Sequence, residues 1–433
     1  MLTRRTLLAT ASALAAASAT ASDSRPALLG GSPVRTEQPA SWPRIHSNDE
    51  EQWSDVLRSR KWHRRAEHYV ADFERAWGER LGAEHVVATN GGTTALYAAL
   101  HAADVGPKDE VIVPPYTFVA TINAVLLHHA LPIFVDTDPG TFQIDASKIE
   151  AALTPRTRVL LPVHMGGAAA DMDAITAVAG KHGKTVIEDA CQAHLAEWKG
   201  RKVGTLGDIG CFSFQASKNL TCGEGGALVT NDAELARRGS AFQNNGAALH
   251  GSTGGLRTGT GCNLRMTEFQ GALLLSQMER LETQARRREQ NAAYLTRLLD
   301  DIPGVTPARM YSGCTRNAYH LYMFRYDPTQ FAGLTRKRFI AAMKAEGIPL
   351  SSGYTPLNLE PFVEQTLRSR AFRAIYSDKE IADWRERNRC PRNDRLCEEA
   401  LWMGQPQLLG ERWHLEQVVE AIEKTRKHAA DLA

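Results

Sequence analysis

Short apolar runs alternate with helical patterns over the first half of the chain, and this alternation constrains the fold more than any other feature. Runs that are apolar at nearly every position predict strands that are covered on both faces. A helical segment between consecutive strands lets neighbouring strands run parallel. The expected strands are 85–89, 110–113, 131–135, 159–163, 185–188, 210–214 and 227–230. The sequence therefore predicts an α/β protein with a mostly parallel sheet between layers of helices.

A long helix separates this region from the remainder of the chain. Thr267 and Gln270 form the T-x-x-Q pattern of a capping box, the helical pattern continues to about Leu299, and Pro303-Gly304 ends it. The other expected elements are helices at 50–60, 68–81, 335–346, 392–402 and 412–428 and a strand at 319–326. We therefore predict a large domain over 49–300 and a smaller C-terminal α/β domain over 301–433. Residues 22–48 are rich in proline and are predicted to form an extended arm.

The first 21 residues have the layout of a secretion signal. Arg4 and Arg5 precede an Ala/Leu stretch, and the small residues Ala19-Thr20-Ala21 predict cleavage before Ser22. The pair Arg4-Arg5 in T-R-R-T-L-L resembles a twin-arginine signal, which exports folded proteins. An ordinary Sec signal or a frayed N-terminus is the alternative. No later stretch is long and apolar enough to span a bilayer, so the expected location is periplasmic or exported.

Composition excludes several classes of protein. With 433 residues, of which 43% are hydrophobic and 23% charged, the chain is not intrinsically disordered. Its 51 basic and 49 acidic residues leave a formal charge of +2, which is too small to create a positive electrostatic field that would attract nucleic acid. The 7 cysteines are odd in number and form no C-x-x-C, which argues against a disulfide framework, a zinc site or any other metal centre.

Two segments at strand ends can hold a phosphate. Residues 90–96 read N-G-G-T-T-A-L between a strand and a helix, so Thr93 can cap the helix and the N–H groups of Gly92 and Thr93 can bind an anion. Ser213, at the end of a later strand, can add a hydrogen bond. A plain glycine turn with a threonine cap is the alternative.

An acid and a lysine also end predicted strands. Asp189 follows V-I-E, and an acid at the end of a buried strand needs a partner such as a protonated pyridine nitrogen. Lys218, before the Gly-rich turn at 223–226, can form a Schiff base with an aldehyde cofactor. A satisfied structural aspartate and a solvated loop lysine are the alternatives for these two residues.

An aromatic segment, P-P-Y-T-F-V-A at 114–120, follows another strand. Phe118 can stack on a flat cofactor ring, and a core aromatic is the alternative. Ligands of open α/β sheets bind beyond the carboxyl ends of the strands, so these segments can converge. A phosphate cradle, a stacking ring, an acid and a lysine together match the needs of pyridoxal 5'-phosphate (PLP).

The chain resembles the DegT/DnrJ/StrS family of sugar aminotransferases from about residue 28 to 409. The strongest stretches are G-T-T-A-L at 92–96, T-F-V-A-T at 117–121, V-D-T-D at 135–138, E-D-A-C-Q-A-H at 188–194, F-S-F-Q-A-S-K-N at 212–219 and N-L-R-M-T-E at 263–268. The resemblance implies the type I PLP-aminotransferase fold, with a large three-layer domain and a smaller C-terminal domain.

The resemblance also assigns roles to residues. Lys218 matches the family's Schiff-base lysine, Asp189 the acid that faces the pyridine nitrogen, and Gln192 the side chain near the ring hydroxyl. The remaining matches are Ser213, Gly92 and Thr93 to the phosphate contacts, Phe118 to the stacking ring, and Asn263 to a residue donated to the neighbouring subunit's cofactor. The resemblance therefore implies a homodimer with shared sites.

The expected activity is a PLP-dependent aminotransferase of amino-sugar biosynthesis, with L-glutamine or L-glutamate as donor and a keto-sugar or keto-cyclitol as acceptor. Gly353 stands where many sugar aminotransferases carry His before Tyr-x-Pro-Leu, and residues 27–35 with C-P at 390–391 resemble the cyclitol and aminohydroxybenzoate branch. Family members with His in place of the lysine are dehydratases, and Lys218 argues against that branch. A non-catalytic sugar-binding protein and a PLP-dependent lyase or dehydratase are the alternatives.

Overall fold

The computed structural model describes residues 24–39, 41–64, 68–247 and 257–433. Its central sheet has seven strands in the order β1-β9-β8-β5-β4-β2-β3. β9 pairs antiparallel with β1 and β8, and the other pairs are parallel. The strands are β1 His85–Thr89, β2 Glu110–Val113, β3 Leu131–Phe134, β4 Thr157–Leu160, β5 Thr185–Asp189, β8 Ile209–Ser213 and β9 Gly226–Thr230. The predicted α/β fold with a mostly parallel sheet is confirmed.

The strands are almost fully buried, as the apolar runs predict. The helices of this half are α2 Ser47–Ser59, α3 Tyr69–Leu81, α4 Gly92–Ala102, α5 Ala120–Leu127, α6 Ile149–Ala152, α7 Met172–His182 and α8 Ala233–Gln243. β4 ends before the predicted 163, since Pro162 cannot donate to a ladder. A small side sheet joins β6 Glu197–Trp198, β7 Arg201–Lys202 and β11 Cys314–Arg316.

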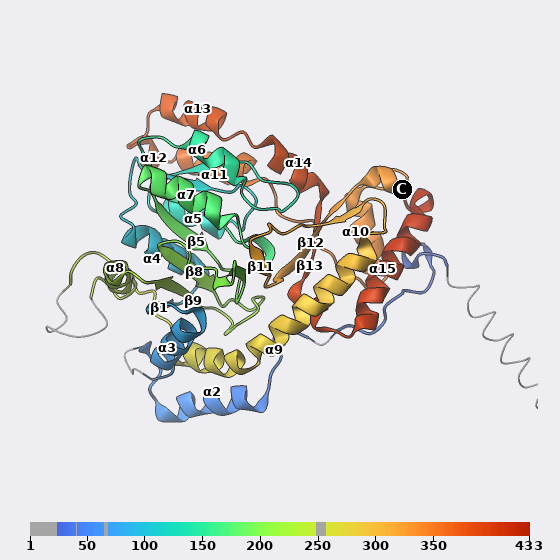
Figure 1. Cartoon of the computed structure of the whole chain (residues 1–433), viewed down its shortest axis with the longest axis horizontal. Helices are drawn as coiled ribbons and strands as arrows, with labels where there is room; N and C mark the ends of the chain where they lie inside the picture. The colour runs from blue at the N-terminus through green and yellow to red at the C-terminus, as the bar shows by residue number, and fades with distance from the viewer. Residues whose placement is uncertain (1–23, 40, 65–67, 248–256) are drawn as a thin grey trace, which may run out of the picture.

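The long helix α9, Glu268–Leu299, connects the two halves of the molecule. Figure 1 shows it running from the α2–α3 pair to the C-terminal helices. Thr267 is its N-cap, and the Gln270 side chain accepts a hydrogen bond from the Thr267 N–H at 2.6 Å. The predicted start, length and capping pattern of this helix are therefore confirmed.

A second core forms around a three-stranded antiparallel sheet. Its strands are β10 Val305–Pro307, β12 Leu321–Tyr326 and β13 Ala400–Gly404, and its helices are α10 Arg336–Ala345, α15 Arg412–Lys427 and α16 Ala429–Leu432. The helix predicted over 392–402 is wrong at its end, because α14 stops at Glu399 and the run from Ala400 pairs with β12 instead. This core also contains Leu295 and Leu299 of α9, and the predicted domain bounds stay a prediction.

The helices α11 Pro361–Leu367, α12 Arg370–Arg373, α13 Asp378–Arg387 and α14 Pro391–Glu399 return to the large sheet. Trp384 Nε1 donates to the Pro132 carbonyl at 2.7 Å, and Asn388 Oδ1 accepts from the Phe134 N–H at 2.5 Å. Both contacts lie on β3, so this segment covers the edge of the sheet.

The described part of the predicted arm packs on the C-terminal half. Arg35 is 2% exposed; its Nη1 donates to Gln407 at 2.8 Å, its Nε to Gln417 at 3.1 Å, and its Nη2 to the His414 carbonyl. The twin-arginine pair Arg4-Arg5 lies outside the described residues. Among the helices that the structure does describe, none combines the length and apolarity that a bilayer crossing requires.

Candidate active site

One cavity of about 530 Å³ opens at the carboxyl ends of the sheet strands. Its walls come from the start of α4, the segment after β2, the ends of β5 and β8, the loop before β9, and two residues of the C-terminal half. The lining residues are Gly91, Gly92, Thr93, Leu96, Thr117, Phe118, Ala120, Thr121, Val163, Asp189, Cys191, Gln192, Ser213, Gln215, Ser217, Lys218, Glu224, His320 and Tyr354. All the predicted site residues except Asn263 therefore meet at one place.

The N-terminus of α4 faces this cavity without a side-chain cap. The expectation that Thr93 caps the helix is wrong: Gly91 is the N-cap, and the neighbouring Thr94 hydroxyl donates to the Gly91 carbonyl at 2.8 Å. A Cβ at Gly92 would lie 2.6 Å from Ser213 Cβ and 3.0 Å from Ser213 Oγ. Glycine at this position keeps the first N–H groups of α4 open beside a hydroxyl, which is an anion-binding arrangement.

Asp189 ends β5 inside the cavity and is 5% exposed. Its Oδ2 accepts from Thr121 Oγ1 at 2.8 Å, and its Oδ1 accepts from the Cys191 N–H at 3.2 Å. Thr121 gives its proton to Asp189, so the 2.9 Å contact between the Thr117 and Thr121 hydroxyls has Thr117 as donor. A carboxylate can accept about four hydrogen bonds, so Asp189 keeps capacity for a further donor in the cavity.

Lys218 lies in the loop that follows β8, and its backbone N–H donates to the Gln215 carbonyl at 2.8 Å. Burial lowers the pKa of its amine, and the nearby Cys191 and Asp189 oppose that shift. Lys218 is half-buried and lines the cavity, which favours the site reading over the solvated-loop alternative. A buried amine with a lowered pKa spends more of its time neutral, which is the form that acts as nucleophile and base.

Two neutral histidines flank this lysine. His194 Nε2 contacts the Ser213 carbonyl at 2.8 Å, and burial lowers the pKa of His194 to about 3. His320 Nδ1 contacts Asn219 Oδ1 at 3.3 Å. The pKa of His320 lies well below the ordinary value, mainly because the ring is buried and secondly because of the positive charge of Lys218. Both rings therefore stay uncharged beside the amine at neutral pH.

Gln192 is held at both ends of its amide. Its Oε1 accepts from the Gly166 N–H at 2.9 Å, and its Nε2 donates to Tyr354 Oη at 2.9 Å. Sequence reasoning placed Gln192 in the site but did not connect it to Tyr354. It also missed Thr121 and His320; Thr121 had a signal, because it closes the T-F-V-A-T stretch.

Phe118 lies on the rim of the cavity with 54% of its surface exposed, so it is not a core aromatic. The core aromatic of that segment is Tyr116, which is fully buried. Asn263 is exposed and forms an isolated β-bridge with Asn244. It does not line the cavity of its own chain, so any role in a cofactor site needs a second subunit.

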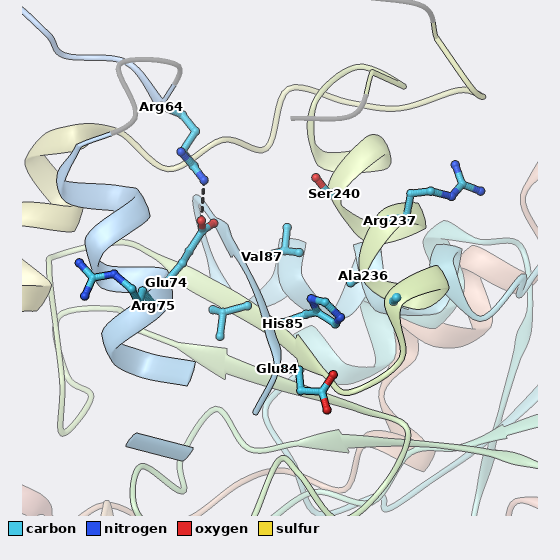
Figure 2. Close-up of a pocket in the computed structure, with 11 residues that line it drawn as sticks. Arg64, Glu74, Arg75, Glu84, His85, Val87, Ala236, Arg237 and Ser240 are labelled. Carbon is cyan, nitrogen blue, oxygen red and sulfur yellow. Dashed lines mark hydrogen bonds and ion pairs between the residues drawn. The ribbon is translucent and has the colours of Figure 1, made fainter. Parts of the chain in front are cut away.

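A second cavity, of about 420 Å³, opens beside the edge strand β1 (Figure 2). Arg64 points at Glu74, and the two form an ion pair at 2.5 Å. Burial raises the pKa of Glu74 to about 7 against the effect of Arg64, and its Oε1 accepts from the Ala88 N–H of β1 at 2.8 Å. Among the described residues, the lining of this cavity contains no lysine or cysteine, so the Lys218 cavity is the candidate active site.

The Lys218 cavity fits PLP on its own residues. Ser213 and the open N–H groups at Gly92 and Thr93 would hold the phosphate, Phe118 can cover a ring face, and Asp189 has capacity for a pyridinium N–H. Lys218 is the amine that would take the cofactor aldehyde. Each of these assignments matches the sequence-based expectation and stays a prediction at the level of individual roles.

Comparison with known proteins gives one consistent family. The model of the DegT/DnrJ/EryC1/StrS aminotransferase family matches residues 43–423. L-Glutamine:2-deoxy-scyllo-inosose aminotransferase of Streptoalloteichus tenebrarius is 36% identical over 420 residues, which cover 94% of this chain and 98% of the relative. The spore coat polysaccharide biosynthesis protein SpsC of Bacillus subtilis is 40% identical over 306 residues, 68% of this chain and 78% of that protein.

Among solved structures, 3-amino-5-hydroxybenzoic acid synthase superposes with a TM-score of 0.80 at 31% identity, covering 90% of this chain and 99% of the synthase. The predicted type I aminotransferase fold is confirmed by this likeness. Together, the family match and the cavity show that this chain belongs to the DegT/DnrJ/EryC1/StrS aminotransferase family and is a PLP-dependent aminotransferase.

Proposed function

We propose that this enzyme moves an amino group from L-glutamine or L-glutamate to a keto-cyclitol, with a keto-sugar as the related acceptor. The observation that carries the proposal is the half-buried Lys218, whose amine pKa is lowered, in the same cavity as Asp189, Gln192 and Ser213. The donor and the acceptor class follow from the relative that is named for L-glutamine and 2-deoxy-scyllo-inosose.

The residues divide the work of amino transfer. When bound, PLP supplies an electron-withdrawing ring that stabilises negative charge on the substrate carbon. The Lys218 amine would take a proton from the donor Cα and later return one to the acceptor carbon, because burial lowers its pKa and so increases the share of amine that is free to accept a proton. Asp189 would hold the pyridine nitrogen of bound PLP and favour its protonated form, since a close carboxylate favours a charged partner.

The direct test incubates the purified protein with PLP, L-glutamine and 2-deoxy-scyllo-inosose and follows the aminated cyclitol by mass spectrometry. The proposal predicts one amine formed per glutamine consumed, and none with Lys218→Ala. Release of ammonia or loss of water without amine would instead indicate a lyase or dehydratase. Binding of cyclitol without turnover across a panel of keto acceptors would indicate a binding protein.

We also propose a homodimer in which Asn263 completes the neighbouring site. Its support is that Asn263 is exposed and lies outside its own chain's cavity. Mixing Lys218→Ala with Asn263→Ala protein tests this, because only a mixed dimer combines one intact Lys218 with one intact Asn263 in a shared site. The mixture should recover about one quarter of the wild-type activity after subunit exchange, whereas unshared sites recover none.

Export through the twin-arginine route is proposed from Arg4-Arg5 and the small residues up to Ala21. This route would let the protein load its cofactor and fold in the cytoplasm before export. Cell fractionation compares the wild-type protein with the Arg4→Lys/Arg5→Lys variant. A periplasmic pool that does not fall in the variant would refute the route.

A further inference from the structure

Tyr354 comes from the C-terminal half and reaches the Asp189 side of the cavity. It follows Ser351, whose backbone exchanges two hydrogen bonds with Trp402 of β13, at 3.0 and 3.2 Å. The Tyr354 ring contacts the Trp402 ring at 4.7 Å, and its hydroxyl meets Gln192 of the large sheet. The side chain is half-buried and lines the cavity, so it forms part of the wall between the two halves.

The hydrogen-bond inventory of Gln192 fixes the direction of this contact. The Gly166 N–H can only donate, so the Gln192 oxygen faces Gly166 and the Gln192 amide nitrogen faces Tyr354. The Tyr354 oxygen therefore accepts, and its own proton is left for another partner. Within the described part of the chain, no acceptor takes that proton. Burial raises the pKa of Tyr354 to about 12, so the proton is present throughout the neutral range.

Tyr116 packs against both Gly353 and the ring of Tyr354, and so helps to position the Tyr354 hydroxyl. Gly353 has φ +80°, and a Cβ there would lie 2.8 Å from Tyr116 Oη and 3.1 Å from Ala400 Cβ. Tyr116 is fully buried, and its ring contacts the Tyr354 ring at 5.5 Å. The Tyr116 oxygen thus occupies the space that any side chain at residue 353 would need. The absence of a side chain at Gly353 therefore makes room for the Tyr116 hydroxyl next to Tyr354.

We propose that Tyr354 is a specificity-determining residue: its hydroxyl, held by Gln192, donates its free proton to a hydroxyl or carbonyl oxygen of the keto acceptor. Tyr116 and Gly353 are positioning residues that act through Tyr354. The inference rests on the proposed function, since it needs a polyhydroxy keto acceptor. A site built to hydrogen-bond a substrate oxygen discriminates against analogues that lack it.

The test separates the two half-reactions of the PLP-loaded enzyme. Bleaching of its visible absorbance by L-glutamine reports the donor half, and return of that absorbance on adding 2-deoxy-scyllo-inosose or scyllo-inosose reports the acceptor half. Tyr354→Phe should raise the acceptor concentration at half-maximal rate about tenfold, the ordinary worth of a lost neutral hydrogen bond. The donor half and the PLP affinity should stay within about threefold of wild type. Tyr294→Phe is the matched control, because its hydroxyl meets Glu416 on the outside of α9.

An unchanged acceptor dependence in Tyr354→Phe overturns the proposal. So does an equal loss in both half-reactions with weaker PLP binding, because that pattern assigns Tyr354 to holding Gln192 only. A wild-type protein that shows no donor half-reaction with any amino acid would refute the proposed function itself, which keeps the two failures distinct.

A second pair of variants tests the positioning residues. Gly353→Ala should weaken the response to acceptor, because its Cβ would lie only 2.8 Å from Tyr116 Oη. The reaction with the amino donor should persist. Adding Tyr116→Phe removes that oxygen and should restore at least half of the loss on a logarithmic scale. The backbone strain of a non-glycine at positive φ is the same in both variants, so rescue reports the overlap alone. Absence of rescue overturns the positioning role.

Discussion

Replacing Gly92 by alanine tests the phosphate cradle in the most local way available. The new Cβ would lie 2.6 Å from Ser213 Cβ and 3.1 Å from Cys191 Sγ. Carbon atoms in good contact are about 3.5–4.0 Å apart, so the overlap with Ser213 is about 1 Å. Ser213 cannot retreat easily, because it ends the buried strand β8 and pairs with Gly226 of β9.

Two opposing effects set the change in stability. Alanine is favoured over glycine in a helix by about 1 kcal/mol, whereas overpacking costs about 1–3 kcal/mol. The free energy of unfolding should therefore fall by about 1 kcal/mol. The effect on the cofactor is larger, since the methyl group fills the opening beside the helix N–H groups and displaces the Ser213 hydroxyl. We expect the dissociation constant of PLP to rise at least tenfold, which corresponds to about 1.4 kcal/mol.

The assay titrates cofactor-free protein with PLP and follows the absorbance of the bound form, alongside urea unfolding. Gly180→Ala is the matched control, because Gly180 lies on α7 without a positive φ, and a Cβ added there would meet no atom within 4 Å. It should leave the PLP affinity unchanged and stabilise the protein slightly. Wild-type affinity in a folded Gly92→Ala protein would refute the cradle.

Two further predictions concern stability. The folded-state pKa of His194, about 3, lies below the ordinary 6.5, so the unfolded chain binds the extra proton and stability falls as pH drops below about 6.5. Between pH 6.5 and 5 the free energy of unfolding should fall by about 2 kcal/mol, at about 1.4 kcal/mol per pH unit. Urea unfolding of His194→Gln should lose that part of the pH dependence. An unchanged pH dependence would contradict the buried neutral ring. Arg35→Ala should lower the free energy of unfolding by about 3 kcal/mol, because it removes a buried side chain and leaves the half-buried Gln407 and the His414 carbonyl without this donor. A loss below about 1 kcal/mol would show that the arm does not support the C-terminal core.

The large sheet was predictable because burial on both faces leaves a direct trace in the sequence. Strands such as β2 and β3 are apolar at nearly every position, and helix α9 carries its start signal in Thr267 and Gln270. The end of α14 was not predictable in the same way. The run from Ala400 suits a helix or a strand by composition, and only its pairing with β12 decides between them.

The site shows the same division. Asp189 and Ser213 each end a strand and Lys218 lies in the loop that follows β8, so their convergence follows from the sheet. The contact between Gln192 and Tyr354 spans 162 residues and depends on how β13 and its neighbouring loop pack against the large sheet. Alternation of apolar runs carries no information about such a contact, and the same holds for His320 beside Asn219.

The central claim is that Lys218 is the working amine of a glutamine-dependent aminotransferase. The most direct measurement is the visible absorption spectrum of the purified protein with PLP, before and after L-glutamine is added. The account predicts a visible band from lysine-bound cofactor that L-glutamine bleaches and a keto-cyclitol restores, and that Lys218→Ala lacks from the start. A protein that binds no PLP, or a band that persists in Lys218→Ala and ignores every amino donor, would contradict the account.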